Sequence, residues 1–523
     1  MNFKGRMATA LSVSILGLTA PIAADAQNVL RWTSQGDALT LDPMSQNEGP
    51  TNAMNGTIYE SLVSRNPSLE LVPELAESWE PGPDGWTFKL REGVKFHDGA
   101  DFTAEDVVFS FERAMAESSD FKEQAKNVAS VEVIDDHTVK LVTDGPNPIL
   151  ANQLTSIMMV DKGWAEANDI VTPQNYAADE ETYAVRNANG TGPFMVESRA
   201  PEELTVLVAN PDWWGKDEFP GNLDRIEYRP ISNAATRVAA LLSGEVDFVL
   251  DPPLQDLERL RAADGLKVET VAQIRSIFFG MDQGIDTLRS SNLEENPFKD
   301  QKVREAFNLA IDREAIKRVA MEGLSFPTAM ITPPGVMGNT PELDEPYGYD
   351  VERAKSLMEE AGYADGFSVQ LDCPNDRYIN DEAICQAAVS MLARIGVDVQ
   401  LDAIPKAQHF PKIQNRTSDF YMLGWGVPTL DSHYVFSYLL AKDGSWNATG
   451  YDNERVNEIT QLITTETDLE KRAALIDEAW QIVREEMPYL PLHHQVIAWA
   501  MSEDFDIPIA ADDALRPRYV VKK

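Results

Sequence analysis

Two cysteines and six histidines are the side chains in this chain best suited to binding a metal ion or moving a proton. Cys373 and Cys385 have no histidine between them, which is a poor pattern for a zinc site. His493 and His494 are adjacent, and adjacent side chains in a strand point to opposite faces, so we do not expect them to share a metal ion. The others, His97, His137, His409 and His433, are scattered along the chain. The sequence therefore predicts no metal site and no cofactor.

The sequence lacks the local motifs of several common enzyme classes. It contains no G-x-S-x-G, G-x-x-x-x-G-K-[ST] or H-E-x-x-H segment, and no G-x-G-x-x-G after a predicted strand. Acidic neighbours such as Glu180 and Glu181 would form a glycosidase dyad only at a defined separation across a cleft, and they are otherwise typical of a solvated surface. This pattern favours a binding protein, with a hydrolase as the remote alternative.

Aromatic residues indicate a binding function more directly. The chain has 10 tryptophans, and Trp213, Trp214 and Trp425 stand beside Gly or Asp in loop-like contexts. Such side chains offer rigid faces to peptide side chains or sugar rings. Most of the tryptophans are nevertheless expected in the core, because tryptophan is mostly buried in folded proteins.

Size and charge narrow the classes further. The 523 residues, of which 43% are apolar and 25% charged, are ordinary for a globular protein of more than one compact unit. The formal net charge of -40 opposes binding to nucleic acid or to an anionic membrane surface. We interpret the charge as a source of solubility, with attraction of a cationic ligand or partner, or adaptation to a salty habitat, as alternatives.

The N-terminal segment 1–26 has the three parts of a secretory signal peptide. Lys4 and Arg6 supply positive charge, the segment 7–18 is apolar or small, and Ala-Asp-Ala at 24–26 matches a cleavage pattern. A transmembrane anchor is the alternative, but the apolar run is shorter than the ~20 residues that a spanning helix needs. No cysteine follows it to carry a lipid. We therefore predict a periplasmic protein that begins at Gln27 and does not insert into the membrane.

Export also bears on the cysteines. Cys373 and Cys385 both lie in the exported part, and an even number of cysteines in an oxidising compartment favours a disulfide. We predict that they form one bridge closing a short loop, with two buried free thiols as the alternative.

Alternating extended and helical patterns indicate an α/β protein. Strands are predicted at 29–32, 86–90, 246–250, 367–371, 397–401 and 420–423. Capping residues predict helices that begin after Thr103, Asn233, Asp300, Asp350 and Asp468, and a further helix is expected over 51–62. No low-complexity linker separates these elements, which favours lobes joined by crossing strands at a hinge.

Ordered motifs run through the chain. The most distinctive are FKLREGVKFHDG at 88–99 and FTAEDVVFS at 102–110. Others are LDP at 41–43, IYESL at 58–62, the segment 71–79, GTGPF at 190–194, LSGEVD at 242–247, VREAF at 303–307, AIDR at 310–313, IGV at 395–397 and PYLPL at 488–492. Together they resemble the family 5 extracellular solute-binding proteins, which are the dipeptide- and oligopeptide-binding proteins of ABC importers. The resemblance covers essentially the whole mature chain.

The resemblance implies a fold as well as a function. The expected fold is the α/β, two-lobed periplasmic binding protein fold (type II, large three-domain subclass) with a hinge between the lobes. Domain I would combine 27–65, 190–275 and 490–523, domain II would be the insertion 66–189, and domain III would span 276–489. The segment 88–99 would be a packing element of domain II, with a structural His97.

The resemblance also implies ligand-binding residues. In peptide-binding members an Asp on a loop of domain III pairs with the peptide ammonium, and an Arg of the same domain takes the C-terminal carboxylate. Asp431 and Arg377 fall near those places, and Arg binds carboxylates through two parallel hydrogen bonds. A helix cap or turn role for Asp431 and a surface ion pair for Arg377 are the alternatives. The predicted ligand-binding set is Asp431, Arg377, Trp425, Tyr378, His433, Trp446, Asn447 and Thr51.

The function implied is capture of a small solute between the lobes and its delivery, by a monomer, to the transmembrane permease subunits of an ABC importer. A dipeptide or oligopeptide is the first expectation. The loop that carries Asp431 lacks the Asp-Pro-Asp sequence common in the family and has Thr-Leu-Asp at 429–431 instead. Sugars, opine-like compounds, nickel complexes and other solutes of the family therefore stay as alternatives, and a sugar would stack on Trp425 and Trp446.

Overall fold

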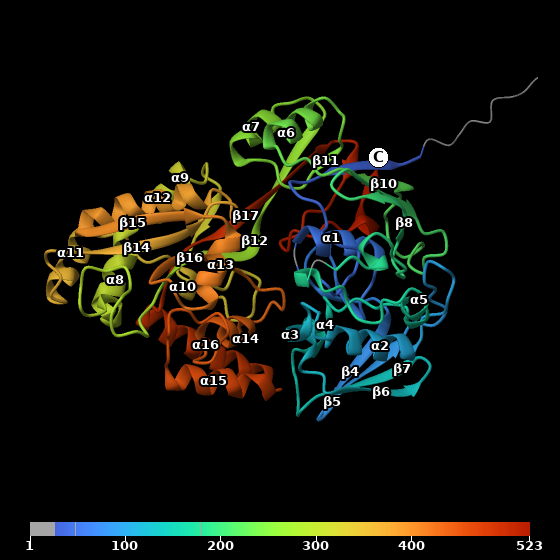
Figure 1. The fold of residues 1–523 in the computed structure, drawn as a ribbon, viewed down its shortest axis with the longest axis horizontal. Coiled ribbons are helices and arrows are strands. Elements are labelled where there is room, and N and C mark those ends of the chain that lie inside the picture. The colour runs from blue at the N-terminus through green and yellow to red at the C-terminus, as the bar shows by residue number, and fades with distance from the viewer. Residues whose placement is uncertain (1–26, 48, 179) are drawn as a thin grey trace, which may run out of the picture.

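Two lobes joined by long strands make up the protein (Figure 1). The computed structural model describes residues 27–47, 49–178 and 180–523. The predicted signal peptide therefore lies outside the described residues. Within those ranges, no helix combines the length and the apolar composition needed to cross a membrane.

An 11-stranded sheet runs through both lobes, and a 4-stranded sheet belongs to the first lobe alone. The large sheet has the order β15 (Val397–Ile404), β14 (Phe367–Pro374), β16 (Phe420–Gly426), β12 (Leu266–Met281), β17 (Tyr489–Ser502), β11 (Phe248–Val249), β1 (Val29–Thr33), β10 (Arg225–Tyr228), β9 (Leu204–Ala209) and β8 (Phe194–Ala200), with β13 (Ser325–Pro327) on β17. The small sheet has the order β4 (Ala76–Gly82), β5 (Gly85–Leu90), β7 (Thr138–Val142) and β6 (Ser130–Asp135). Separate pairs join β2 (Val63–Arg65) to β3 (Leu71–Pro73) and β18 (Phe505–Asp506) to β19 (Val521–Lys522). The small sheet lies within the segment 66–189, while the domain boundaries stay a prediction.

The helices divide between the lobes in the same way (Figure 1). The first lobe carries α1 (Gly49–Ile58), α2 (Ala104–Ala114), α3 (Lys122–Ala125), α4 (Leu150–Leu154) and α5 (Lys162–Ala167). Beside the crossing strands lie α6 (Ala234–Leu242) and α7 (Leu257–Arg261). The second lobe carries α8 (Gln301–Ala310), α9 (Arg313–Val319), α10 (Pro341–Asp344), α11 (Val351–Glu360), α12 (Asp381–Leu392), α13 (Lys406–Gln414), α14 (Ser432–Val435), α15 (Glu454–Thr465) and α16 (Leu469–Glu486).

The predicted helix starts are confirmed. Asn233, Asp300, Asp350 and Asp468 each accept a backbone N–H of the first turn of the helix that follows. Thr103 precedes α2, and its own N–H donates to the Asp106 carboxylate at 2.9 Å. These contacts are local, since they satisfy N–H groups that have no partner inside the helix.

The helix predicted over 51–62 is shorter than expected and ends at Ile58. The Ile58 carbonyl accepts the N–H of Gly192 at 2.9 Å. A Cβ at Gly190 would lie 2.1 Å from the same carbonyl oxygen, so only glycine permits this approach. A segment distant in sequence therefore terminates α1.

The strand predictions are confirmed for β1, β5, β14, β15 and β16. In the predicted strand 246–250 only Phe248–Val249 forms regular ladders, with β1 on one side and β17 on the other. Its neighbours also bond to β1 through the backbone, from Asp247 N–H to the Arg31 carbonyl and from Leu250 N–H to the Thr33 carbonyl.

Two hydrophobic cores cover opposite faces of the sheet in the second lobe. Phe420 and Met422 of β16 join the core formed with α8, α11 and α12, whereas Tyr421 and Leu423 join the core formed with α14, α15 and α16. Because side chains alternate along a strand, Gly424 belongs to the first of these faces and Trp425 to the second.

The strands β12 and β17 connect the lobes. They pair from Leu266 to Ala272 of β12 and again from Ser276 to Gly280, and the register shifts between these two stretches. Residues 273–275 are therefore a β-bulge in the strand that passes from one lobe to the other, and we call this segment the hinge bulge.

Candidate functional site

The hinge bulge, residues 273–275, bonds to both lobes. The Ile274 N–H donates to the Ala511 carbonyl at 2.9 Å, and the Ile274 carbonyl accepts the Val427 N–H at 2.9 Å. Ala511 belongs to the C-terminal segment, and Val427 follows β16. Bulges bend a strand and redirect its side chains, and this one places Arg275 at the junction of the lobes.

Gly424 of β16 makes room for the Tyr378 ring, and Gly426 lies beside Arg275 on the same face. Arg275 is paired with Gly426 across the ladder of β12 and β16, so both lie on the same face. A Cβ at Gly424 would lie 2.6 Å from the ring of Tyr378, whereas a Cβ at Gly426 would meet Arg275 Nε at an ordinary 3.8 Å. The Tyr378 hydroxyl donates to the Gly424 carbonyl at 3.3 Å. The side chains of Tyr378 and Arg275 therefore both pack against the end of β16.

We expect Gly424→Ala to lower the free energy of unfolding by about 1–3 kcal/mol, because the added methyl group must displace the buried Tyr378 ring. Gly426→Ala is the matched control, since its methyl group finds space. Urea unfolding followed by fluorescence measures both. Equal stability of the two variants would contradict the conclusion that Gly424 makes room for the Tyr378 ring.

Arg377 lies in the loop between β14 and α12. The Asp381 carboxylate accepts the backbone N–H groups of Arg377 and Tyr378, each at 3.0 Å. The predicted disulfide between Cys373 and Cys385 is confirmed, with a Cα–Cα distance of 6.6 Å, and it ties both ends of this loop together. The Arg377 guanidinium lies 5.2 Å from the centroid of the Tyr378 ring.

At the junction, two arginine side chains carry positive charge that no paired carboxylate among the described residues neutralises. Neither Arg275 nor Arg377 forms a salt bridge with any carboxylate in the described ranges. Burial, reinforced by the positive charge of Arg377, lowers the pKa of Arg275 to about 10. Asp513 is the nearby acid, and burial raises its pKa to about 7 while its Oδ1 accepts the Trp499 indole N–H at 2.9 Å. The junction is therefore suited to receiving an anionic group.

An aromatic cluster lies on the opposite face of β16. It consists of Trp425, Tyr434, Tyr438 and Trp446, with ring centroids of Trp425 at 5.8, 5.6 and 5.7 Å from the other three in that order. The π-helical turn Phe436–Leu440 follows α14 and carries Tyr438, whose ring centroid is 4.7 Å from that of Tyr434. The Trp425 Nε1 atom is buried without a hydrogen-bond partner among the described residues. Such a cluster can pack against an apolar or planar group.

Asp431, the predicted ammonium partner, forms an internal ion pair in this conformation. Its two carboxylate oxygens accept from Arg472 at 2.6 and 2.8 Å, and the two side chains are 4% and 1% exposed. Asp431 also caps α14 by accepting the His433 N–H at 2.9 Å. An incoming ammonium would have to share this carboxylate.

Three other predicted ligand residues make internal contacts. The His433 Nε2 lies 3.0 Å from the Thr464 hydroxyl, and burial lowers the pKa of His433 to about 4. Asn447 donates to the carbonyls of Ala441 and Tyr451 and organises its own loop. Thr51 is fully buried in the first lobe, where its hydroxyl accepts the Leu39 N–H at 3.0 Å. Their roles toward a ligand stay predictions.

The predicted set thus divides in space. Arg377 and Tyr378 flank the junction on one face of β16, and Trp425 and Trp446 join the aromatic cluster on the other. Trp213 and Trp214, also considered for a cleft, instead donate their indole N–H groups to the buried Glu60 carboxylate at 3.0 and 2.8 Å. Both tryptophans are half-buried in the first lobe.

Arg275 was missed by sequence reasoning, as were Tyr434, Tyr438 and Arg472. Arg275 could have been noticed, because it is the only cation in the segment 268–281, which ends in IFFGM at 277–281. Nothing local marks Arg472, which stands in an ordinary amphipathic helix pattern.

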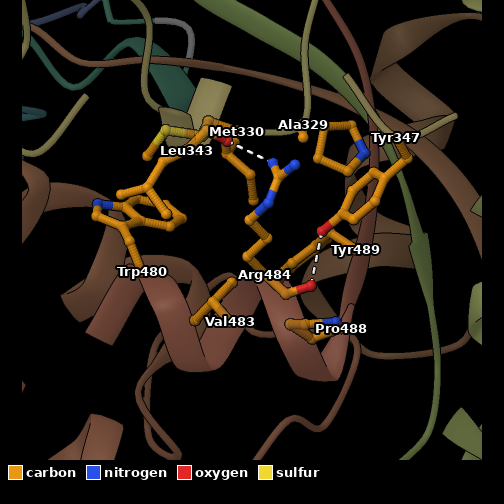
Figure 2. A pocket seen from close by; sticks show the side chains of 11 residues that line it. Ala329, Met330, Leu343, Tyr347, Trp480, Val483, Arg484, Pro488 and Tyr489 are labelled. Atoms are coloured by element: carbon orange, nitrogen blue, oxygen red, sulfur yellow. Dashed lines mark hydrogen bonds between the residues drawn. The ribbon is translucent and has the colours of Figure 1, made fainter. Parts of the chain in front are cut away.

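Two pockets of the described residues lie away from the junction. Figure 2 shows the enclosed one in the second lobe, where Arg484 donates to the Leu343 carbonyl at 2.6 Å and Tyr347 to the Arg484 carbonyl at 2.8 Å. Its volume of about 10 Å³ suffices for one water molecule. An open hollow of about 320 Å³ lies in the first lobe beside His97, Trp164 and Glu197. No group of three or more His, Cys, Asp or Glu side chains in the described ranges is arranged to hold a metal ion.

Comparisons with known proteins agree with the fold. The family described as "Bacterial extracellular solute-binding proteins, family 5 Middle" matches residues 70–447. The chain is similar to the glutathione-binding protein GsiB of Salmonella typhimurium, with 28% identity over 512 residues and 94% of each chain covered.

Solved structures give the same result. A dipeptide binding protein from Pseudoalteromonas sp. SM9913 in complex with Met-Leu is 25% identical with a TM-score of 0.78, over 95% of this chain and 100% of that one. AgaA from A. tumefaciens R10, in complex with agropinic acid, is 25% identical with a TM-score of 0.78, over 95% of this chain and 99% of that one. The two-lobed binding-protein fold predicted from the sequence is confirmed.

Proposed function

The chain belongs to the family 5 bacterial extracellular solute-binding proteins, and from this premise we propose that it captures a small peptide at the lobe junction for an ABC importer. It would act in the periplasm as a monomer, after cleavage behind Ala26, and present its cargo to the transmembrane permease subunits. It would neither catalyse a reaction nor insert into the membrane.

The ligands of the similar proteins support a peptide-like solute. They are glutathione, the dipeptide Met-Leu and agropinic acid. Their shared feature, a carboxylate on a small polar molecule, matches the excess of positive charge at the junction.

The proposal rests mainly on Arg377, on its lack of a paired carboxylate in the described part of the chain and on its fixed position. Its guanidinium has no salt bridge within the described ranges, and it lies against the Tyr378 ring in a loop that the Cys373–Cys385 disulfide constrains. An arginine held in this way is ready to bind a carboxylate through two hydrogen bonds. The aromatic cluster beyond β16 offers a surface for an apolar side chain.

The proposal predicts binding of free dipeptides such as Met-Leu, measured by isothermal titration calorimetry and by the rise in melting temperature. We expect Arg377→Gln to weaken binding by about 10- to 100-fold, because a charged hydrogen bond to the ligand is lost. Arg394→Gln is the matched control, since Arg394 also lies over a tyrosine ring, Tyr349, at 5.8 Å.

Three outcomes would contradict the proposal. One is indifference of the wild type to the whole dipeptide panel. The second is an equal loss of affinity in Arg377→Gln and Arg394→Gln. The third is release of a cleaved product after incubation, which would support a hydrolase instead.

A sugar is the second candidate, favoured by the aromatic cluster and by the unpaired Trp425 indole N–H. Aromatic faces stack on sugar rings, and the indole N–H can donate to a hydroxyl. Binding of saccharides that survives Arg377→Gln would favour this candidate.

A further inference from the structure

Arg275 is the charged group at the junction to which the family resemblance assigns no role. We propose that Arg275 is an anion-binding residue of this site and that, together with Arg377, it selects solutes that carry two carboxylates. This inference rests on the proposed function and specifies the class of solute.

The backbone positions Arg275 for this role. The hinge bulge, residues 273–275, interrupts the ladder of β12 and β17 and bonds to the first lobe through Ala511 and to the second through Val427. Arg275 is thus anchored where the lobes meet. Its partner in the ladder of β12 and β16 is Gly426, so its side chain lies on the face of β16 that Tyr378 contacts.

The charges around Arg275 also favour this role. Arg275 is half-buried, and it lies close enough to Arg377 for the two positive charges to disfavour each other. Asp513 offsets this charge only in part, since it forms no salt bridge with Arg275 and accepts the Trp499 indole N–H instead. A charge that is partly removed from water is stabilised by a counter-charge. One ligand carboxylate would pair one arginine and leave the other, whereas two carboxylates would pair both.

Geometry favours two separate carboxylates over one compact anion. Arg275 comes from the hinge bulge, whereas Arg377 comes from the loop 375–380 and is held against Tyr378. Two guanidiniums from different elements can each bind a carboxylate side by side. An acidic dipeptide supplies one carboxylate from its C-terminus and one from its side chain.

The test compares two dipeptides of the same shape, Ala-Glu and Ala-Gln, by isothermal titration calorimetry with the full mature chain. We expect the wild type to bind Ala-Glu at least about tenfold more tightly, because only Ala-Glu forms a second charged pair. Arg275→Gln should bring the ratio of the two affinities close to one while leaving the affinity for Ala-Gln within about threefold of wild type. The matched control is Arg318→Gln, an exposed arginine of α9 in the second lobe.

The melting temperature of the ligand-free protein separates selection from a structural role. Removing an unpaired, half-buried charge should leave the melting temperature unchanged or raise it. A fall in melting temperature, together with equal losses for both dipeptides, would overturn the inference in favour of a structural arginine.

Other results bear on the two proposals separately. Equal binding of Ala-Glu and Ala-Gln by the wild type overturns the inference and leaves peptide capture intact. Stabilisation by inorganic phosphate as strong as that by Ala-Glu, and lost in Arg275→Gln, overturns selection of two carboxylates in favour of a general anion site. If no dipeptide binds, the proposal of peptide capture is wrong. The inference is then tested by comparing the affinities of the wild type for glutarate and for the monoamide of glutarate, and equal affinities overturn it.

Discussion

Asp431→Asn is expected to lower the free energy of unfolding by about 3–5 kcal/mol, because it leaves Arg472 buried without its carboxylate. The pair is bidentate at 2.6 and 2.8 Å, and both side chains are almost fully inaccessible. Asparagine keeps an oxygen that can still cap α14, so the variant removes the charge and spares the cap. Urea unfolding of the ligand-free chain measures the loss.

A double variant and a control define the origin of the loss. Adding Arg472→Met should recover much of it, since a neutral pair no longer buries an uncompensated charge. Glu478→Gln is the matched control, because Arg455 and Glu478 form a bidentate pair at 2.7 and 2.8 Å that is exposed to solvent. We expect a far smaller loss there. Equal losses in Asp431→Asn and Glu478→Gln would show that burial does not govern this pair.

The same variant tests the prediction that Asp431 pairs with a ligand ammonium. The ratio of affinities for a free dipeptide and its N-acetyl form is measured well below the unfolding temperature. A ratio that falls in Asp431→Asn supports that role. An unchanged ratio assigns Asp431 to the structure of the second lobe alone.

Replacement of both cysteines by alanine is expected to lower the free energy of unfolding by about 3 kcal/mol, because the unfolded chain gains the freedom of an open loop. Cys373 and Cys385 are 12 positions apart, and the loop between them contains Arg377 and Tyr378. A more mobile β14–α12 loop should also weaken the binding of a carboxylate by Arg377, since the arginine is no longer preorganised. We therefore expect a weaker affinity for a free dipeptide at temperatures where the variant is fully folded.

Unfolding of the wild type with and without a reductant is the control. The reduced wild type should match the double alanine variant in stability, because both lack only the bridge. A variant that keeps full affinity would show that the β14–α12 loop is held by the Asp381 contacts alone. Full stability of the variant would contradict the account of the bridge.

Features of the fold that depend on neighbouring residues were predictable from the sequence. Asn233, Asp300, Asp350 and Asp468 start helices because a short polar side chain satisfies N–H groups a few residues ahead. The disulfide followed from the expected compartment and the cysteine count. The family and its two-lobed fold followed from the order of motifs along the chain.

Features that depend on distant residues were decided only by the tertiary structure. Gly190 and Gly192 end α1 from more than 130 positions away, so the 51–62 pattern alone predicted too long a helix. Arg472 reaches Asp431 across 41 positions and occupies the carboxylate that the sequence left open for a ligand.

The candidate site shows the same division. The residue types of Arg377 and Tyr378 were visible in the sequence, but the neighbourhood of Arg275 was not. The register shift between β12 and β17 and the pairing of Arg275 with Gly426 in the ladder of β12 and β16 place Arg275 at the junction, and both are properties of strand pairing. The sequence itself determines side-chain charge and local capping, whereas the partner of each buried charge is determined only when distant segments pack together in the folded chain.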